Sequence, residues 1–426
     1  MSETGASGGT PDGDIPDGDT DTPDGETPVP ARDGRIRRQR VIGAALVLVV
    51  AGAAGWFAVG HGRATAAAHH NIEITPTGCA PGWQPAAGSA QSFVIVNKSG
   101  RTGEIYLLDT NGGVVGEIEG LGPGVQRTMS VPLANGVYKW LCVMTDMPVR
   151  ASGQGRVTGS TAPAVEAVLP VSEKDLAAPV AAYQAYVAPK LADLLRQVGT
   201  LRGAVQAGDV ATARSDWLAA QSTWEQVGAA YGSFEDLGDA IGGLPHGLPG
   251  GVTDADFTGL HRIEFGLWHN EKPASLLPVV DKLAADVTEL RGKLPQLTID
   301  PNDLSLRAHE ILEDALRDHL TGSTDQGSGA AFAETYADLQ GTRVVFEELA
   351  ALVTARRPEL PAQARDQMNT LEVALLANRT DGRWLGLSAA PLANRQRVNG
   401  ALGALLETLA AVPDLLEIRN ASQATK

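Results

Sequence analysis

Residues 172–420 form a long series of amphipathic segments, and this series constrains the fold more than any other feature. Apolar residues recur there at three- and four-residue intervals, which is the spacing that lines one face of an α-helix. Glycine- and proline-containing breakers, such as residues 242–245, separate the segments by short connections. Helices joined in this way pack antiparallel, so we expect an all-α unit, a double four-helix bundle. The predicted helices are residues 172–208, 209–231, 253–268, 273–294, 300–320, 327–356, 358–378 and 391–412.

The pattern is different between residues 71 and 160. Short runs rich in β-branched and aromatic residues alternate there with turn signals such as Asn111-Gly112-Gly113. Several short strands at this spacing indicate a small β-sandwich. Residues 159–171 are rich in alanine and proline and read as the linker to the helical unit. The chain is therefore predicted to be multidomain.

The N-terminal region predicts a membrane segment. Residues 1–33 consist of acidic PDGD-like repeats with almost no bulky apolar residue, so residues 1–40 are expected to be a disordered cytoplasmic tail. Five arginines precede an uncharged run at residues 41–60, which is long enough to span a bilayer. The arginines place the tail inside and all later residues outside. The run is either a retained single-pass signal anchor or a cleaved signal peptide. Cleavage would follow the alanine cluster at residues 64–68 and would release a secreted or periplasmic protein.

The net charge of -16 argues against a nucleic-acid partner, because phosphate binding needs clustered Lys and Arg. Cys79 and Cys142 are the only two cysteines, and both follow the apolar run. In an oxidising compartment such a pair most simply forms a disulfide. The alternative is a second metal site in which Cys142 binds copper together with a residue such as Glu104. A blue-copper centre is not expected, because residues 71–160 contain no histidine.

The clearest chemistry lies in an HxxE motif made by His261 and Glu264. On a helix these residues are one turn apart on the same face, so an imidazole and a carboxylate can bind the same cation. This pair suits zinc, iron, copper or manganese better than calcium. The alternative is a partly buried histidine that is hydrogen-bonded to a neighbouring carboxylate. His246 is expected in a loop, either as an ordinary loop residue or as part of a lid over the site. His269, eight residues after His261, is a further candidate ligand if the helix continues that far.

The string GLHRIEFGLWHN around the motif resembles the imelysin-like, peptidase-related family, which includes the EfeO components of bacterial iron uptake. The β-rich segment, with Cys79 near its start and Cys142 near its end, resembles the cupredoxin-like domain of EfeO-type members. The resemblance covers most of residues 71–420 and implies that the chain binds iron, with copper or zinc as further possibilities. It also implies two partners, a membrane iron permease and a haem peroxidase-like protein.

The resemblance also implies ligands beyond the motif. By position, Glu225 is similar to an aromatic-Glu ligand of the family, Asp239 to an acidic residue before the HxxE helix, and Glu313 to a later acidic position. Two features depart from the family pattern. Its Asp-Leu-Asp run reads Asp-Leu-Gly at residues 236–238, and a second glutamate is replaced by Gly228.

These observations predict an extracytoplasmic iron-binding protein, not an enzyme, that delivers iron to a membrane permease. The alternative is an HxxE metallopeptidase anchored at the cell surface. Zinc hydrolases commonly use HExxH, in which a glutamate next to the first histidine activates water. Here Arg262 follows His261, so that base is missing. A third hypothesis is a surface-tethered interaction protein without a metal site.

Overall fold

The computed structural model of the chain describes residues 68–85 and 90–420. The predicted acidic tail and the apolar run at residues 41–60 lie outside the described residues. Within the described part of the chain, no helix combines the length and the apolar character that a bilayer-spanning segment needs.

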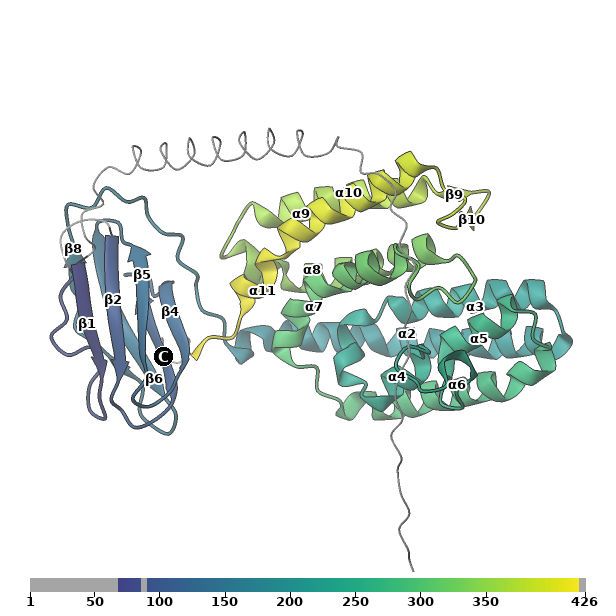
Figure 1. Cartoon of the computed structure of the whole chain (residues 1–426), viewed down its shortest axis with the longest axis horizontal. Coiled ribbons are helices and arrows are strands. Elements are labelled where there is room, and N and C mark those ends of the chain that lie inside the picture. Colours follow the sequence, from purple (N-terminus) through teal and green to yellow (C-terminus); the bar gives the residue numbers. More distant parts are fainter. Residues whose placement is uncertain (1–67, 86–89, 421–426) are drawn as a thin grey trace, which may run out of the picture. The chain divides into compact units, whose positions relative to one another are not determined.

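The β part consists of two sheets (Figure 1). In the first, β2 pairs in parallel with β1 and antiparallel with β5. In the second, β3 lies between β4 and β6, and β6 also pairs with the short strands β7 and β8. The strands are β1 (Ala68–Ile74), β2 (Ala90–Asn97), β3 (Gly103–Leu108), β4 (Val114–Leu121), β5 (Gln126–Pro132), β6 (Gly136–Met144), β7 (Arg150–Ala151) and β8 (Gly155–Val157).

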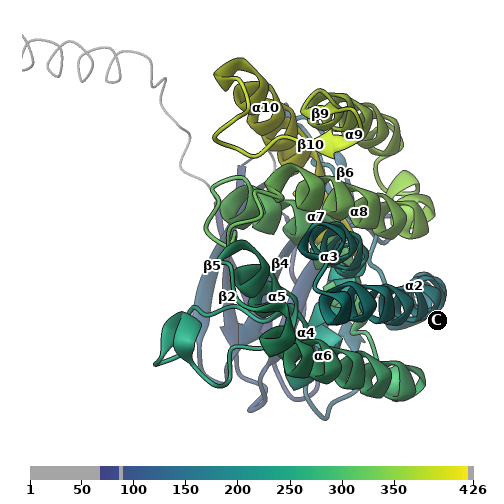
Figure 2. The ribbon, with the colours of Figure 1, turned by 90° about the vertical axis from the view of Figure 1, so that its right-hand side faces the viewer.

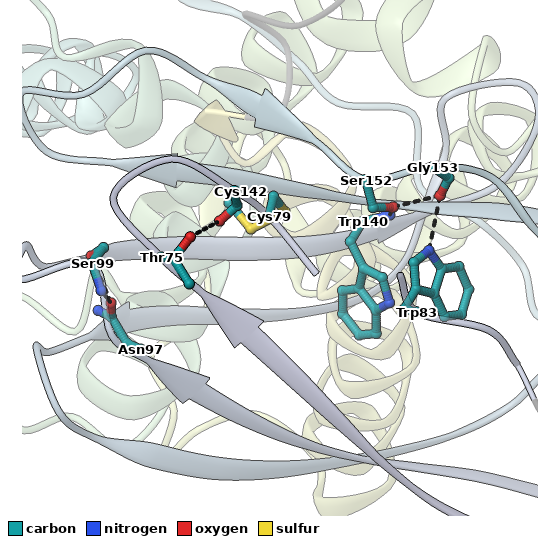
Figure 3. The surroundings of a disulfide bond; sticks show 10 residues. Thr75, Cys79, Trp83, Asn97, Ser99, Trp140, Cys142, Ser152 and Gly153 are labelled. Atoms are coloured by element: carbon teal, nitrogen blue, oxygen red, sulfur yellow. Dashed lines mark hydrogen bonds between the residues drawn. A yellow bond between two sulfur atoms is a disulfide. The ribbon is translucent and has the colours of Figure 1, made fainter. Parts of the chain in front are cut away.

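The two sheets share one apolar core, as expected for strands whose alternate side chains face inward. Phe93 from β2 and Trp140 from β6 meet edge to face in this core, with ring centroids 4.9 Å apart. Cys79 and Cys142 are joined by a disulfide with an S–S distance of 2.04 Å, close to Trp83 and Trp140 (Figure 3). The pairing leaves no free thiolate for a metal.

The first helix of the α part, α2 (Glu173–Ala207), begins and ends as its sequence predicts. Ser172 accepts a hydrogen bond from the Asp175 backbone N–H, and the Asp175 carboxylate accepts one from the Ser172 N–H, which together make a capping box. The helix ends at Gly208, where a φ of 73° is readily adopted by glycine. Asp209 then caps α3.

The α part is all-helical apart from one small hairpin, which confirms the predicted class. The helices are α2 (Glu173–Ala207), α3 (Val210–Glu225), α4 (Asp236–Gly242), α5 (Gly259–Trp268), α6 (Pro273–Lys293), α7 (Pro301–Asp314), α8 (Ala331–Thr354), α9 (Leu360–Leu376), α10 (Leu392–Leu409) and α11 (Ala411–Leu416). The hairpin consists of β9 (Arg379–Thr380) and β10 (Arg383–Trp384). Short turns of other helix types are η1 (Gly228–Ser233), η2 (Gly251–Thr253), η3 (Leu294–Gln296) and the π-helical η4 (Ala315–His319).

The helices pack in successive layers (Figure 2). Helix α9 contacts both α10 and α8, and α7 lies against α8. Helices α2 and α3 pack against α8, and α6 lies on the other side of α2. A single apolar core runs through all these layers. Of the predicted ligands, Glu225, His261 and Glu264 are buried in this helical part, whereas Asp239 and Glu313 are exposed.

Three helix predictions need correction. Residues 236–242 form α4, where a loop was expected. The predicted helix at residues 253–268 begins only at Gly259, because Thr253 ends the 3-10 turn η2 and Asp254 follows it in extended conformation. The predicted helix at residues 300–320 changes at Ala315 into the π-helical turn η4. In all three places the local sequence permits a helix, and packing around the site decides its bounds.

Candidate metal centre

Helix α5 presents the HxxE motif to the interior. It begins at Gly259 with a φ of 78°, and a Cβ atom there would lie 2.4 Å from the Ile241 carbonyl oxygen. Glycine therefore allows the start of α5 to lie directly against the end of α4. This approach brings the His261 Nδ1 atom within 2.6 Å of the Gly242 carbonyl oxygen.

His261 is arranged as a ligand with one free nitrogen. Its side chain is buried, and burial lowers the pKa of the imidazole, which favours the neutral form. A carbonyl oxygen can only accept, so the ring proton belongs on Nδ1 and the lone pair on Nε2. Nε2 is buried and has no hydrogen-bond partner among the described residues. A backbone contact that fixes the tautomer in this way is typical of metal-binding histidines.

In Glu264, as in His261, one polar side-chain atom is hydrogen-bonded and the other has no hydrogen-bond partner in the described structure. Its Oε1 accepts hydrogen bonds from the backbone N–H groups of Gln326 and Ser328, at 3.0 and 3.1 Å. Its Oε2 is buried without a partner in the described structure. Burial, followed by the charge of Glu334, raises the pKa of Glu264 to about 9, although the Ser328 hydrogen bond opposes the shift. A bound cation would compensate the negative charge of the ionised, buried Glu264 carboxylate.

A second group of ligand atoms comes from α3, η4 and α8. Candidate ligand atoms of Glu225, His319 and Asp338 all lie within 4.8 Å of one another, and all three residues are buried. His319 Nε2 is 3.3 Å from Asp338 Oδ2 and 3.9 Å from Glu225 Oε2. An imidazole and two carboxylates at these distances form a set of nitrogen and oxygen ligands suited to iron, zinc or manganese.

Glu225 is held in place by its neighbours. Gln221, one turn earlier on α3, donates to Glu225 Oε1 at 2.7 Å, and the Tyr231 hydroxyl donates to Oε2 at 3.4 Å. Burial and the charge of Asp338 raise the pKa of Glu225 to about 8, although the charge of His319 opposes the shift. The pocket therefore holds carboxyl groups that retain protons near neutral pH.

Glu334 connects the two groups. Its Oε2 lies 3.4 Å from His319 Nδ1, and its charge acts on the titration of both His261 and Glu264. On His319, burial lowers the pKa, but the charges of Glu334, Asp338 and Glu225 outweigh this effect and raise it well above its usual value. The buried centre thus consists of two imidazoles and four carboxyl groups from helices far apart in the sequence: Glu225, His261, Glu264, His319, Glu334 and Asp338.

A cavity of about 1190 Å³ leads to this centre. Glu225, His261 and His319 line it. Apart from Tyr231, its remaining ionisable lining consists of one lysine, one histidine and five aspartates: Lys282, His246, Asp236, Asp239, Asp256, Asp314 and Asp318. The excess of carboxylates favours the entry of cations over anions.

The structure brings together some of the predicted ligands and separates others. Glu225 and His261 line the cavity, and Asp239 lines it as part of α4. Glu264 follows His261 by three residues on α5 but is not part of the lining. Glu313 is not part of the cavity lining, and its carboxylate lies 3.5 Å from His309 on a largely exposed face of α7. His246 lines the cavity from an exposed loop.

Two further candidates have other contacts. His269 is the residue after α5, and its ring stacks on Phe265 with centroids 4.0 Å apart. Glu104 in the β part accepts hydrogen bonds from the side chains of Tyr106 and Asn420. With the two cysteines in a disulfide, the proposed Cys142 and Glu104 copper site has no thiolate.

Sequence reasoning missed His319, Glu334 and Asp338. One signal was present: Glu334 and Asp338 lie four residues apart in a helix whose other buried residues are all uncharged. Two acidic side chains on such a face need a compensating partner. His319 had no comparable signal, because its position depends on the π-helical turn η4.

Comparisons with known proteins agree with this architecture. Residues 179–412, more than half of the chain, match the model of the family described as Imelysin (Peptidase_M75). An "Iron uptake system component EfeO" from Yersinia pestis is 26% identical over 345 residues, which cover 81% of this chain and 90% of the relative. A protein of the same description from Escherichia coli O157:H7 is 24% identical over 346 residues, with the same coverage of both chains.

Proposed function

The chain belongs to the imelysin family and is of the EfeO type, and from this premise we propose that it is an extracytoplasmic iron-binding protein. It captures iron at the buried centre around His261 and Glu264 and delivers it to a membrane iron permease. The observation that carries the proposal is the buried triad Glu225, His319 and Asp338, together with the unpartnered Nε2 atom of His261, a residue that lines the same cavity as Glu225 and His319. The names of the relatives, which describe iron uptake components, support iron as the ion.

The chemistry of the centre favours iron as cargo. Its ligands are carboxylate oxygens and imidazole nitrogens, with no sulfur, and such sets suit iron and manganese as well as zinc. Copper and zinc are therefore the competing ions to be tested. Glu225 and Glu264 hold protons in the metal-free protein and must lose them to bind. Capture thus releases protons, and a lower pH promotes release of the ion.

The proposal includes a location and partners. The arginine-flanked run at residues 41–60 is proposed to export the chain, either as a retained single-pass anchor or as a cleaved signal. The β-sandwich is proposed to be cupredoxin-like, a fold also expected from the resemblance to EfeO-type members. A membrane permease would receive the iron, and a haem peroxidase-like protein would complete the system.

We propose no catalytic role. Peptidase activity is the second candidate, because the matched family is named Peptidase_M75. A zinc hydrolase needs a base near the metal-bound water. At the motif the residue after His261 is Arg262, whose guanidinium instead pairs with Glu271 at 3.0 Å. The arrangement favours binding and release over hydrolysis.

The test is metal binding by the purified protein. Fe²⁺ under argon, Fe³⁺, Zn²⁺ and Cu²⁺ are each titrated against a competing chelator. We expect micromolar or tighter iron binding by the wild type and at least about a hundredfold loss in His261→Ala, because a buried ligand is removed. His309→Ala is the matched control, since His309 also pairs with a glutamate but lies on another face of the molecule.

The outcomes separate the hypotheses. Equal iron binding by wild type and His261→Ala would contradict the site assignment. Zinc binding without iron binding, together with cleavage of a test protein, would favour the peptidase. A wild type that binds none of the four ions would favour an interaction protein without a metal site.

A further inference from the structure

The loop between η4 and α8 touches both halves of the metal centre. Thr324 Oγ1 lies 3.3 Å from His319 Nδ1. Two residues further on, the backbone N–H groups of Gln326 and Ser328 donate to Glu264 Oε1. We define residues 324–329 as the clasp loop, because it holds groups from α5 and η4 together.

Asp325 shapes the clasp loop. Its Oδ1 accepts hydrogen bonds from the backbone N–H groups of Gly327 and Gly329, at 3.1 and 2.9 Å, and from the Ser328 hydroxyl at 3.2 Å. These contacts curl the chain around a single oxygen atom. Gly327 and Gly329 have φ values of 119° and 68°, a backbone region that glycine enters without a steric penalty.

The consequence of this curl is the orientation of two N–H groups. With Asp325 at the centre of the turn, the backbone N–H groups of residues 326 and 328 point toward the same oxygen of Glu264. One carboxylate oxygen is thereby held, and the other, Oε2, remains buried and unpartnered in the described structure.

We propose that Asp325 is a positioning residue for the metal centre: through the clasp loop it holds Glu264 Oε1, so that Oε2 is presented to the cation. Asp325 is not itself a ligand in this proposal. The proposal rests on the proposed function for the identity of the cation, whereas the shape of the loop is independent of it. Groups that orient a metal ligand commonly change metal affinity by about 10- to 100-fold when they are removed.

Two substitutions distinguish positioning from ligation. Asp325→Ala removes the acceptor at the centre of the turn, and we expect about a tenfold or greater loss of iron affinity. Asp325→Asn keeps an Oδ1 acceptor for the same three donors, and we expect affinity within about threefold of the wild type. The probe is Fe²⁺ or Fe³⁺ alone, whichever the wild type binds more tightly. Unchanged affinity in Asp325→Ala overturns the proposal, and so does an Asp325→Asn variant as weak as Asp325→Ala.

Asp109→Ala is the matched control. Asp109 Oδ1 accepts from the backbone N–H groups of Asn111 and Gly113, both at 2.8 Å, so it shapes a similar turn in the β part. The substitution removes the same kind of hydrogen bonds away from the metal centre. We expect unchanged iron affinity in this variant.

A measurement without metal separates failure of this proposal from failure of the proposed function. Hydrogen–deuterium exchange is followed at the N–H groups of Gln326 and Ser328 in the metal-free full chain. We expect slow exchange in the wild type and Asp109→Ala, and faster exchange in both Asp325→Ala and Glu264→Ala. Exchange that stays slow in Asp325→Ala overturns the positioning role, even if the wild type proves to bind no iron.

Discussion

The two parts of the molecule have cores of opposite character. Among the described residues of the β-sandwich, the buried polar side chains that are neither aromatic nor cysteine are neutral: Gln91, Ser92, Asn97 and Ser99. The helical core instead buries Glu225, Glu264, Glu334 and Asp338 together with two histidines. Burying an ionisable group lowers stability unless a partner compensates its charge. The comparison indicates that burial of ionisable groups lowers the stability of the helical core, as expected if these groups are retained for the proposed binding site.

The largest expected effect tests the stabilising role of the sandwich core. The Cys79→Ser and Cys142→Ser double variant opens a link between residues separated by 63 positions, which is expected to lower the free energy of unfolding by about 4 kcal/mol. Chemical denaturation followed by Trp fluorescence measures the change. Iron affinity of the folded variant should stay unchanged, and a large loss of affinity would show that the two cores are not independent.

The next effect is the pH dependence of metal binding. The pKa values of about 8 for Glu225 and about 9 for Glu264 mean that both carboxyl groups hold protons at pH 6 and must lose them to bind a cation. Each displaced proton lowers affinity by up to about tenfold per pH unit. Affinity for Fe²⁺ should therefore fall by at least about 100-fold between pH 8 and pH 6, measured by competition under argon. A flat profile would mean that these carboxyl groups are not displaced by the ion.

A smaller effect tests whether the buried Glu225 carboxylate lowers the stability of the helical part. The pKa of Glu225 is raised from 4.5 to about 8 in the folded chain, so its protonated form stabilises the fold below pH 4.5, and this contribution is lost as pH rises toward 8. Glu225→Gln cannot ionise and keeps an oxygen acceptor for Gln221. We expect the metal-free variant to gain about 2 kcal/mol of stability at pH 9 and little at pH 4.

Thermal unfolding of wild type and Glu225→Gln at both pH values measures this difference. The same variant should bind iron more weakly, because a neutral amide replaces a carboxylate ligand. A variant that is less stable than the wild type at pH 9 would contradict the idea that this carboxylate is retained for binding.

The smallest effect concerns a residue that sequence similarity placed among the ligands. Glu313 is about half exposed, and its ion pair within the described structure is with His309 at 3.5 Å. Glu313→Ala should therefore change stability by less than about 0.5 kcal/mol. Iron affinity should remain within about twofold of the wild type in the same chelator competition. A larger loss of affinity would place Glu313 on the path of the ion.

The two parts also differ in how far their structure follows from local sequence. The all-α class of the second part is predicted by apolar residues at three- and four-residue spacing, and its first helix by the capping box at Ser172. Helix α4 is a helix that the local pattern did not predict, and it is only seven residues long. A helix of that length is not stable alone and exists through packing against its neighbours.

The sequence by itself determined the two classes of core, the HxxE motif and the cysteine pair. These features depend on periodicity and on neighbours within one helical turn, which are visible in a linear chain. The tertiary structure alone decided that His319 and Asp338 meet Glu225, that Glu334 meets His319, and that the clasp loop holds Glu264. It also decided that Glu313 lies apart from them. Such contacts join residues up to about a hundred positions apart, and only the packing of helices in three dimensions sets which of them meet.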